Sequence, residues 1–216
     1  MGYLLTGPKA KTPFRVRYDD GEAAFQLTHV LQEHLLARPA NTSVVLMCIG
    51  TDRSTGDALG PLVGSEVTER NDRVQLFGTL DNPVHAVNLE ETIRQVAHMV
   101  PKPYIVAIDA CLGQSASVGQ ITLAQGALQP GAGVHKHLPA VGDIHITGIV
   151  NVGGCMEYFV LQNTRLSMVF KMANVIADAV AGALFETESR LRSATATDMR
   201  SVQRTPITRL HALFKR

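Results

Sequence analysis

The arrangement of apolar residues in the first half of this chain restricts it to few folds. Short runs rich in Val and Ile, of strand length, alternate there with longer segments in which apolar residues recur at helical spacing. This alternation predicts parallel strands joined by crossover helices. We therefore expect an α/β fold of three layers (α/β/α) with a mostly parallel, twisted sheet. The expected helices are 21–36, 61–70 and 88–100, and the expected strands are 43–49, 73–78 and 104–108.

In the second half of the chain, the expected helices and strands no longer alternate regularly. Strands are expected at 118–123 and 144–150, joined by a long segment rich in Gly, Pro and His at 129–139, and one long helix is expected at 157–192. Residues 1–20 are expected to form an irregular arm and residues 193–216 a flexible or amphipathic tail. Because 45% of the 216 residues are hydrophobic, the chain can bury a core of its own, and we expect a single domain over 1–216.

Two aspartates follow apolar strand-like runs. Asp57 lies in the segment GTDRSTGDALGP (residues 50–61), which joins the 43–49 run to the next helix, and Asp109 directly follows the run Tyr104–Ile108. Ligands of open α/β sheets bind beyond the carboxyl ends of the parallel strands. If the two strands are neighbours, the two carboxylates meet there. Such a pair is suited to acid–base chemistry or to binding a divalent metal.

Each candidate residue also has a structural explanation. Asp57 could be the N-cap of the helix that contains Pro61, and Asp109 could cap a turn at the sheet edge. One of His135, His137 or His145 could join the two carboxylates in a site for Zn²⁺, Ni²⁺ or Mn²⁺, although a loop or surface position is the commoner role for each. His85 is a further loop candidate.

Composition disfavours several classes of function. The formal net charge of +1 indicates no strong attraction to nucleic acid or to an anionic membrane. The N-terminal residues lack the apolar stretch of a signal peptide, and we expect no membrane-spanning segment. Three widely spaced cysteines without a CxxC pattern favour a reducing, intracellular setting and a core role for Cys48 and Cys111.

Three segments resemble a known group of proteins. The segment GTDRSTGDALGP is similar to the glycine turn and PDALGP motif of the spore germination protease, and Ile108-Asp109-Ala110 followed by Ser115 is similar to that protease's second aspartate segment. The segment QPGAGV (residues 129–134) resembles its HPGSGV stretch. The chain is therefore similar to the YyaC-type sporulation proteins, smaller relatives of the germination protease, and more distantly to the HybD-type hydrogenase maturation peptidases.

The resemblance carries expectations about fold and activity. It implies a phosphorylase/hydrolase-like fold, with Asp57 and Asp109 in the places of the germination protease's proposed catalytic pair. It suggests a sporulation-associated peptidase in the cytoplasm of a sporulating cell or spore, whose substrate is a peptide or protein, such as a spore protein. The maturation peptidases suggest the alternative of a nickel, zinc or manganese site, here Asp57, Asp109 and His135, with His137 or His145 as substitutes.

The sequence also departs from the germination protease. Gln129 stands where that protease has a His, and the chain is much shorter. A third possibility is therefore a non-catalytic binding or assembly protein that kept the fold. Homo-oligomers are compatible with all three alternatives.

Overall fold

One six-stranded sheet organises the computed structural model, which describes residues 12–71, 74–131 and 138–202, with side chains to residue 193. The strand order is β1-β5-β6-β4-β2-β3. Strands β3, β2, β4 and β6 are parallel, and β5 and β1 continue the sheet in antiparallel pairing. The expected mostly parallel α/β sheet is thus confirmed. The strands are β1 (Phe14–Arg17), β2 (Ser43–Cys48), β3 (Gln75–Phe77), β4 (Pro103–Gly113), β5 (Gln120–Gln125) and β6 (Ile144–Val152).

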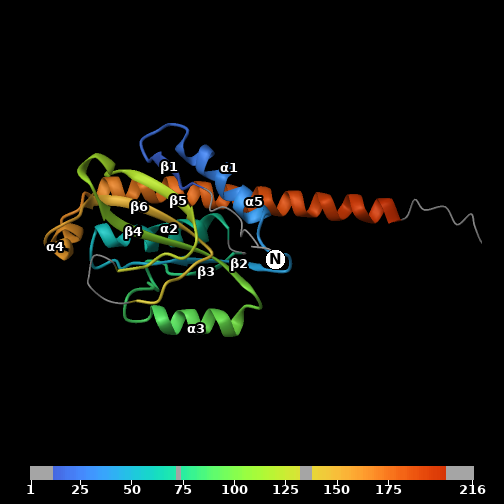
Figure 1. Cartoon of the computed structure of the whole chain (residues 1–216), viewed down its shortest axis with the longest axis horizontal. Helices are drawn as coiled ribbons and strands as arrows, with labels where there is room; N and C mark the ends of the chain where they lie inside the picture. Colours follow the sequence, from blue (N-terminus) through green and yellow to red (C-terminus); the bar gives the residue numbers. More distant parts are fainter. Residues whose placement is uncertain (1–11, 72–73, 132–137, 203–216) are drawn as a thin grey trace, which may run out of the picture.

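Helices cover both faces of the sheet (Figure 1). Helices α1 (Ala23–Leu36), α2 (Leu59–Arg70) and α5 (Leu166–Val202) pack on one face, in a core that includes Val106 and Ile108 of β4. Helix α3 (Leu89–Met99) packs on the other face, in a second core that includes Ala107. Because side chains alternate along a strand, Asp109 lies on the same face as Ala107, the face covered by α3.

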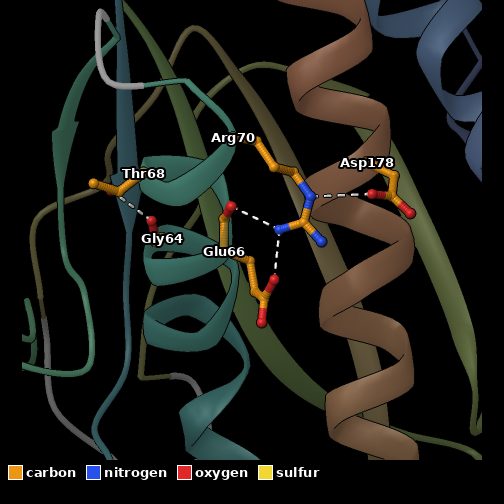
Figure 2. A network of polar contacts seen from close by, with 5 residues as sticks. All are labelled: Gly64, Glu66, Thr68, Arg70 and Asp178. Carbon is orange, nitrogen blue, oxygen red and sulfur yellow. Dashed lines mark hydrogen bonds and ion pairs between the residues drawn. The ribbon is translucent and has the colours of Figure 1, made fainter.

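An arginine connects two of the helices on the first face. Arg70, at the end of α2, donates from Nε to Asp178 Oδ1 of α5 at 3.2 Å (Figure 2). Its Nη1 donates to the backbone oxygen of Glu66 at 2.6 Å and to the Glu66 carboxylate at 2.5 Å. Asp178 is 58% exposed, so the ion pair orients the helices more than it stabilises them.

The structure corrects the expectations for both ends of the chain. Residues 14–17 of the expected irregular arm form β1, which pairs with β5. The expected helix 157–192 is two helices, α4 (Glu157–Gln162) and α5, and α5 continues to Val202, into the expected tail. In Figure 1, α5 extends well past the edge of the sheet. Residues 203–216 lie outside the described part.

Helix α5 also bears on the expected absence of a membrane span. By length and composition alone, its segment Leu166–Ser193 is long and apolar enough to cross a membrane. Half of the most apolar window is buried inside the fold, however. Residues such as Ile176, Ala177 and Val180 are fully buried against the sheet and α1, which accounts for the apolar composition.

Candidate active site

The candidate site lies where β2 leaves the sheet while β4 continues. Strand β2 pairs with β4 up to Cys48 and Ile108, and the Ile49 N–H donates to the Ile108 carbonyl at 2.7 Å. Asp109 is the next residue of β4, and it pairs with Thr147 of β6. The expectation that Asp109 ends its strand was wrong, because β4 runs on to Gly113. Asp109 instead occupies the point at which β4 loses its neighbour on the β2 side.

A tight glycine loop brings Asp57 back toward the end of β2. The Thr51 N–H donates to the Asp57 carbonyl at 3.1 Å. Gly50 has a φ of +144°, and a Cβ at that position would lie 2.0 Å from the Asp57 carbonyl oxygen. Only glycine permits both this φ and this approach. The sequence signal of glycines after a buried strand therefore has a direct structural cause.

Asp57 is not the N-cap of α2. It is the middle residue of the short 3₁₀ helix η1 (Gly56–Ala58), which runs into α2, and the cap position is taken by Ala58 without a side-chain hydrogen bond. The structural explanation offered for Asp57 therefore fails. Its half-buried carboxylate is left for another role.

The two aspartates interact electrostatically. Burial raises the pKa of Asp57 above its ordinary value, and the nearby charge of His85 partly offsets this effect. Asp109 is only 6% exposed, and burial raises its pKa well above the ordinary value. The negative charge of Asp57 raises the pKa of Asp109 further, whereas the Ala110 N–H, which donates to Asp109 Oδ1 at 2.8 Å, lowers it. Asp57 is therefore the carboxyl that ionises first.

His85 is the histidine that the structure brings to Asp57. The preceding residue, Val84, forms a parallel bridge with Ile49, and its carbonyl accepts from the Gly50 N–H at 2.8 Å. The His85 ring is oriented by the Val87 N–H, which donates to Nδ1 at 3.2 Å. Sequence reasoning ranked His85 behind other histidines because nothing in the chain indicated that Val84 returns to the sheet.

Asn88 holds this loop in place. Its Oδ1 accepts from the His85 N–H at 2.8 Å, and its Nδ2 donates to the Pro83 carbonyl at 3.0 Å. Asn88 immediately precedes α3, but its side chain makes no capping bond to the helix. Its side chain instead supports the His85 loop.

Cys111 and Thr147 line the same face of the sheet as Asp109. Burial raises the pKa of the Cys111 thiol to about 11, a side-chain hydrogen bond with Thr147 lowers it, and the charge of Asp109 raises it. Thr147 is the cross-strand partner of Asp109. These neighbours give Asp109 a partly apolar environment that favours its protonated form.

The histidines favoured from sequence are placed differently. His145 lies on β6 opposite Ala107, and its Nδ1 is hydrogen-bonded to the Gly126 carbonyl at 2.9 Å. His135 and His137 lie outside the described residues. Within the described residues, no group of three His, Cys, Asp or Glu side chains is placed to hold a metal ion. The metal site of Asp57, Asp109 and His135 remains a prediction.

The chemistry open to this arrangement follows from its charges. An ionised, half-buried carboxylate can accept a proton from water, and a neighbouring protonated carboxyl can donate a hydrogen bond. When their environments separate the pKa values of two carboxyl groups, one group can act as the proton acceptor and the other as the hydrogen-bond donor.

Comparison with known proteins agrees with the fold. The uncharacterized protein YyaC of Bacillus subtilis (strain 168) is 51% identical over 166 residues, which are 76% of this chain and 80% of that protein. The crystal structure of the NiFe hydrogenase maturation protease HycI from Thermococcus kodakarensis KOD1 has a TM-score of 0.51. That match covers 72% of this chain and 98% of the protease at 20% identity, so it shows a shared fold.

The expected resemblance to YyaC-type proteins and to the maturation-peptidase fold is thus confirmed. The family model described as "Protein of unknown function (DUF1256)" matches residues 15–179. With three quarters of the chain matched and a relative at 51% identity, this chain belongs to the DUF1256 family.

Proposed function

We propose that this protein is a peptidase in which Asp57 acts as the general base and protonated Asp109 polarises the scissile carbonyl. The observation that carries the proposal is the coupled pair itself: burial raises both pKa values, and the charge of Asp57 raises that of Asp109. The maturation-protease fold supports a peptidase over other hydrolases. The similarity to the germination protease supports a substrate from spore proteins and a place in the cytoplasm of a sporulating cell or spore.

The environments of the two aspartates support a division of roles. Asp57, with His85 nearby, is the carboxylate that takes a proton from the attacking water. Asp109, more deeply buried and facing the charge of Asp57, stays protonated and donates a hydrogen bond to the scissile carbonyl oxygen. When the tetrahedral intermediate collapses, Asp57 returns its proton to the leaving amine. Proton transfers of this kind contribute about 10²–10⁴-fold to rate.

Cleavage mapping by mass spectrometry tests this proposal. The wild-type protein is incubated with a peptide library prepared from a Bacillus subtilis proteome, and new termini are identified. We expect Asp57→Asn and Asp109→Asn each to lower cleavage by about 10²-fold or more. Asp52→Asn is a matched control in the same loop, since Asp52 is exposed and accepts a hydrogen bond from the neighbouring Thr51 hydroxyl. Cleavage at the wild-type rate by either aspartate variant would contradict the mechanism.

Chelation separates this mechanism from the metal-dependent alternative. If the two carboxyls act as acid and base, EDTA leaves the cleavage rate unchanged. A loss of cleavage in EDTA that Ni²⁺, Zn²⁺ or Mn²⁺ restores would assign the aspartates to a metal site. If wild type and variants all fail to cleave, a binding or assembly role replaces the peptidase.

A further inference from the structure

A cleft of about 490 Å³ opens between β3 with its following loop and helix α3. Its walls include Phe77 and Thr79 on the strand side and Asn88 and Gln95 on the helix side, and His85 also lines it. The wall around His85 is firmly built, because Asn88 bonds to both His85 and Pro83. A cleft of this size can hold several atoms of a ligand without rearrangement.

Backbone hydrogen bonds connect the wall of the cleft to the loop that carries Asp57. The Gly50 N–H donates to the carbonyl of Val84 in the cleft wall at 2.8 Å. The next N–H along the chain, that of Thr51, donates to the carbonyl of Asp57 at 3.1 Å. Gly50 and Thr51, two consecutive residues of one loop, therefore bond to the cleft wall and to Asp57, respectively. His85, which lines the cleft, also acts electrostatically on Asp57.

Strand β3 offers an open edge along this cleft. It is the last strand of the sheet, paired with β2 on one side, and none of the described strands pairs with its other side. The backbone N–H and C=O groups on such an edge are a template for another extended chain. An added strand would pair with these groups, while its alternate side chains point into and away from the neighbouring cleft.

The opposite edge of the sheet provides a comparison. A second cleft of about 430 Å³ adjoins β1, lined by residues such as Arg15, Arg17 and Gln26. Two strands, β5 and β6, lie between β1 and β4, which carries Asp109, whereas only β2 lies between β3 and β4. The β3 edge is therefore the nearer of the two to Asp109, and it adjoins the strand that leads into the Asp57 loop.

We propose that an extended polypeptide binds as an added strand on β3, in the cleft against α3, and that this position delivers one of its peptide bonds past His85 to Asp57 and Asp109. The inference rests on the proposed function, because it describes how that site holds its substrate. It makes the substrate an unfolded segment or terminus, since a folded domain offers no free extended backbone of this kind.

Selection of binding peptides tests the inference. A random dodecapeptide library displayed on phage is selected against the Asp57→Asn variant, and an enriched peptide is synthesised. We expect its binding to slow hydrogen exchange of the Gln75–Phe77 amides. Methylation of the peptide's backbone nitrogens should weaken binding about 5- to 10-fold at alternate positions only. Slowed exchange confined to β1 or another surface, or no enrichment over the unselected library, would overturn the inference.

Paired variants test the position independently. Gln95 is an exposed residue of the α3 wall, so Gln95→Trp narrows the cleft without disturbing the core. Gln26→Trp makes the same change in the cleft at β1. Peptide affinity should fall about tenfold or more in Gln95→Trp and stay unchanged in Gln26→Trp, with folding of both checked by thermal unfolding. Equal affinity in both would contradict the placement on β3.

The two proposals fail separately. If wild-type protein cleaves peptides while the β3 amides stay unprotected, the cleft is wrong and the peptidase stands. If peptides bind on β3 and the wild-type protein cleaves none of them, the cleft stands and the peptidase is wrong.

Discussion

Asp57, in the loop that follows β2, and Asp109, the β4 residue just after the last β2–β4 pair, lie close enough for the charge of Asp57 to raise the pKa of Asp109. Asp57 reaches this position through a loop whose Gly50 touches its backbone, and Asp109 lies where β4 runs past the end of β2. The pair is therefore fixed by backbone geometry on both sides, which allows each residue to be tested by itself.

The contribution of Asp109 to the stability of the protein should fall as the pH rises through the acidic range. The pKa of Asp109 is raised in the folded state, so between its unfolded value near 3.8 and its folded value the native state binds more protons than the unfolded state. Stability is then full below the unfolded pKa and decreases until the folded pKa is passed. Asp109→Asn should remove this dependence and raise the melting temperature at neutral pH.

Thermal unfolding from pH 3.5 to 8 measures the effect on stability. Asp52→Asn, at an exposed site, serves as the control. A variant Asp109→Asn that is less stable than wild type at pH 7.5 would show that the Asp109 carboxylate is stabilised by its surroundings, contrary to the burial described above.

Removing His85 should shift the pH dependence of cleavage. The charge of His85 lowers the pKa of Asp57, so in His85→Gln the pKa of Asp57 is higher. Because Asp57 acts as the base only when ionised, the acidic limb of the kcat/KM profile should move to higher pH. His98→Gln, an exposed position on the same side of the sheet, should leave the profile unchanged. An unshifted limb in His85→Gln would show that the two side chains do not interact.

Gly50→Ala should be among the most damaging single substitutions in the chain. A Cβ at Gly50 would lie 2.0 Å from the Asp57 carbonyl oxygen, and backbone atoms cannot move aside cheaply. We expect a loss of more than about 4 kcal/mol in the free energy of unfolding. Gly126→Ala separates backbone strain from the steric clash. Gly126 has a φ of +101° but no atom within 4 Å of an added Cβ. It should cost about 1–3 kcal/mol from strain alone.

Urea unfolding of both variants measures these costs, with Gly21→Ala as the unstrained reference. Equal losses for Gly50→Ala and Gly126→Ala would mean that the contact with Asp57 contributes nothing beyond backbone strain.

The three cysteines should react with iodoacetamide at different rates. Burial raises the pKa of Cys48 to about 12 and that of Cys111 to about 11, whereas Cys155 is exposed. Since the thiolate is the reactive form, Cys155 alone should be alkylated in the native protein at pH 8. All three should react in denaturant. Peptide mapping after a short pulse reads this pattern, and rapid native labelling of Cys111 would contradict the buried position beside Asp109.

Much of the sheet could be predicted because its central strands are buried on both faces. The run at residues 43–49 and the run Tyr104–Ile108 are apolar throughout, and short helical segments between them permit only parallel pairing. Strand β1 was missed because Phe14–Arg17 is an edge strand with two exposed arginines, and its pairing with β5 depends on residues about 100 positions away. The break between α4 and α5 was missed because the apolar residues on both sides keep a helical spacing.

For the candidate site, the sequence by itself determined the two aspartates and the glycine loop. These features are local. Gly50 has a φ of +144°, which favours glycine, and each carboxylate follows a buried strand, so both can be recognised from neighbouring residues in the sequence. The choice of histidine was decided only by the tertiary structure. His85 reaches Asp57 because Val84 bonds to Ile49 and Gly50 across the sheet edge, whereas His145 bonds to Gly126 instead. Contacts between distant segments depend on how the whole sheet assembles, and they cannot be predicted from the spacing of residues along the chain.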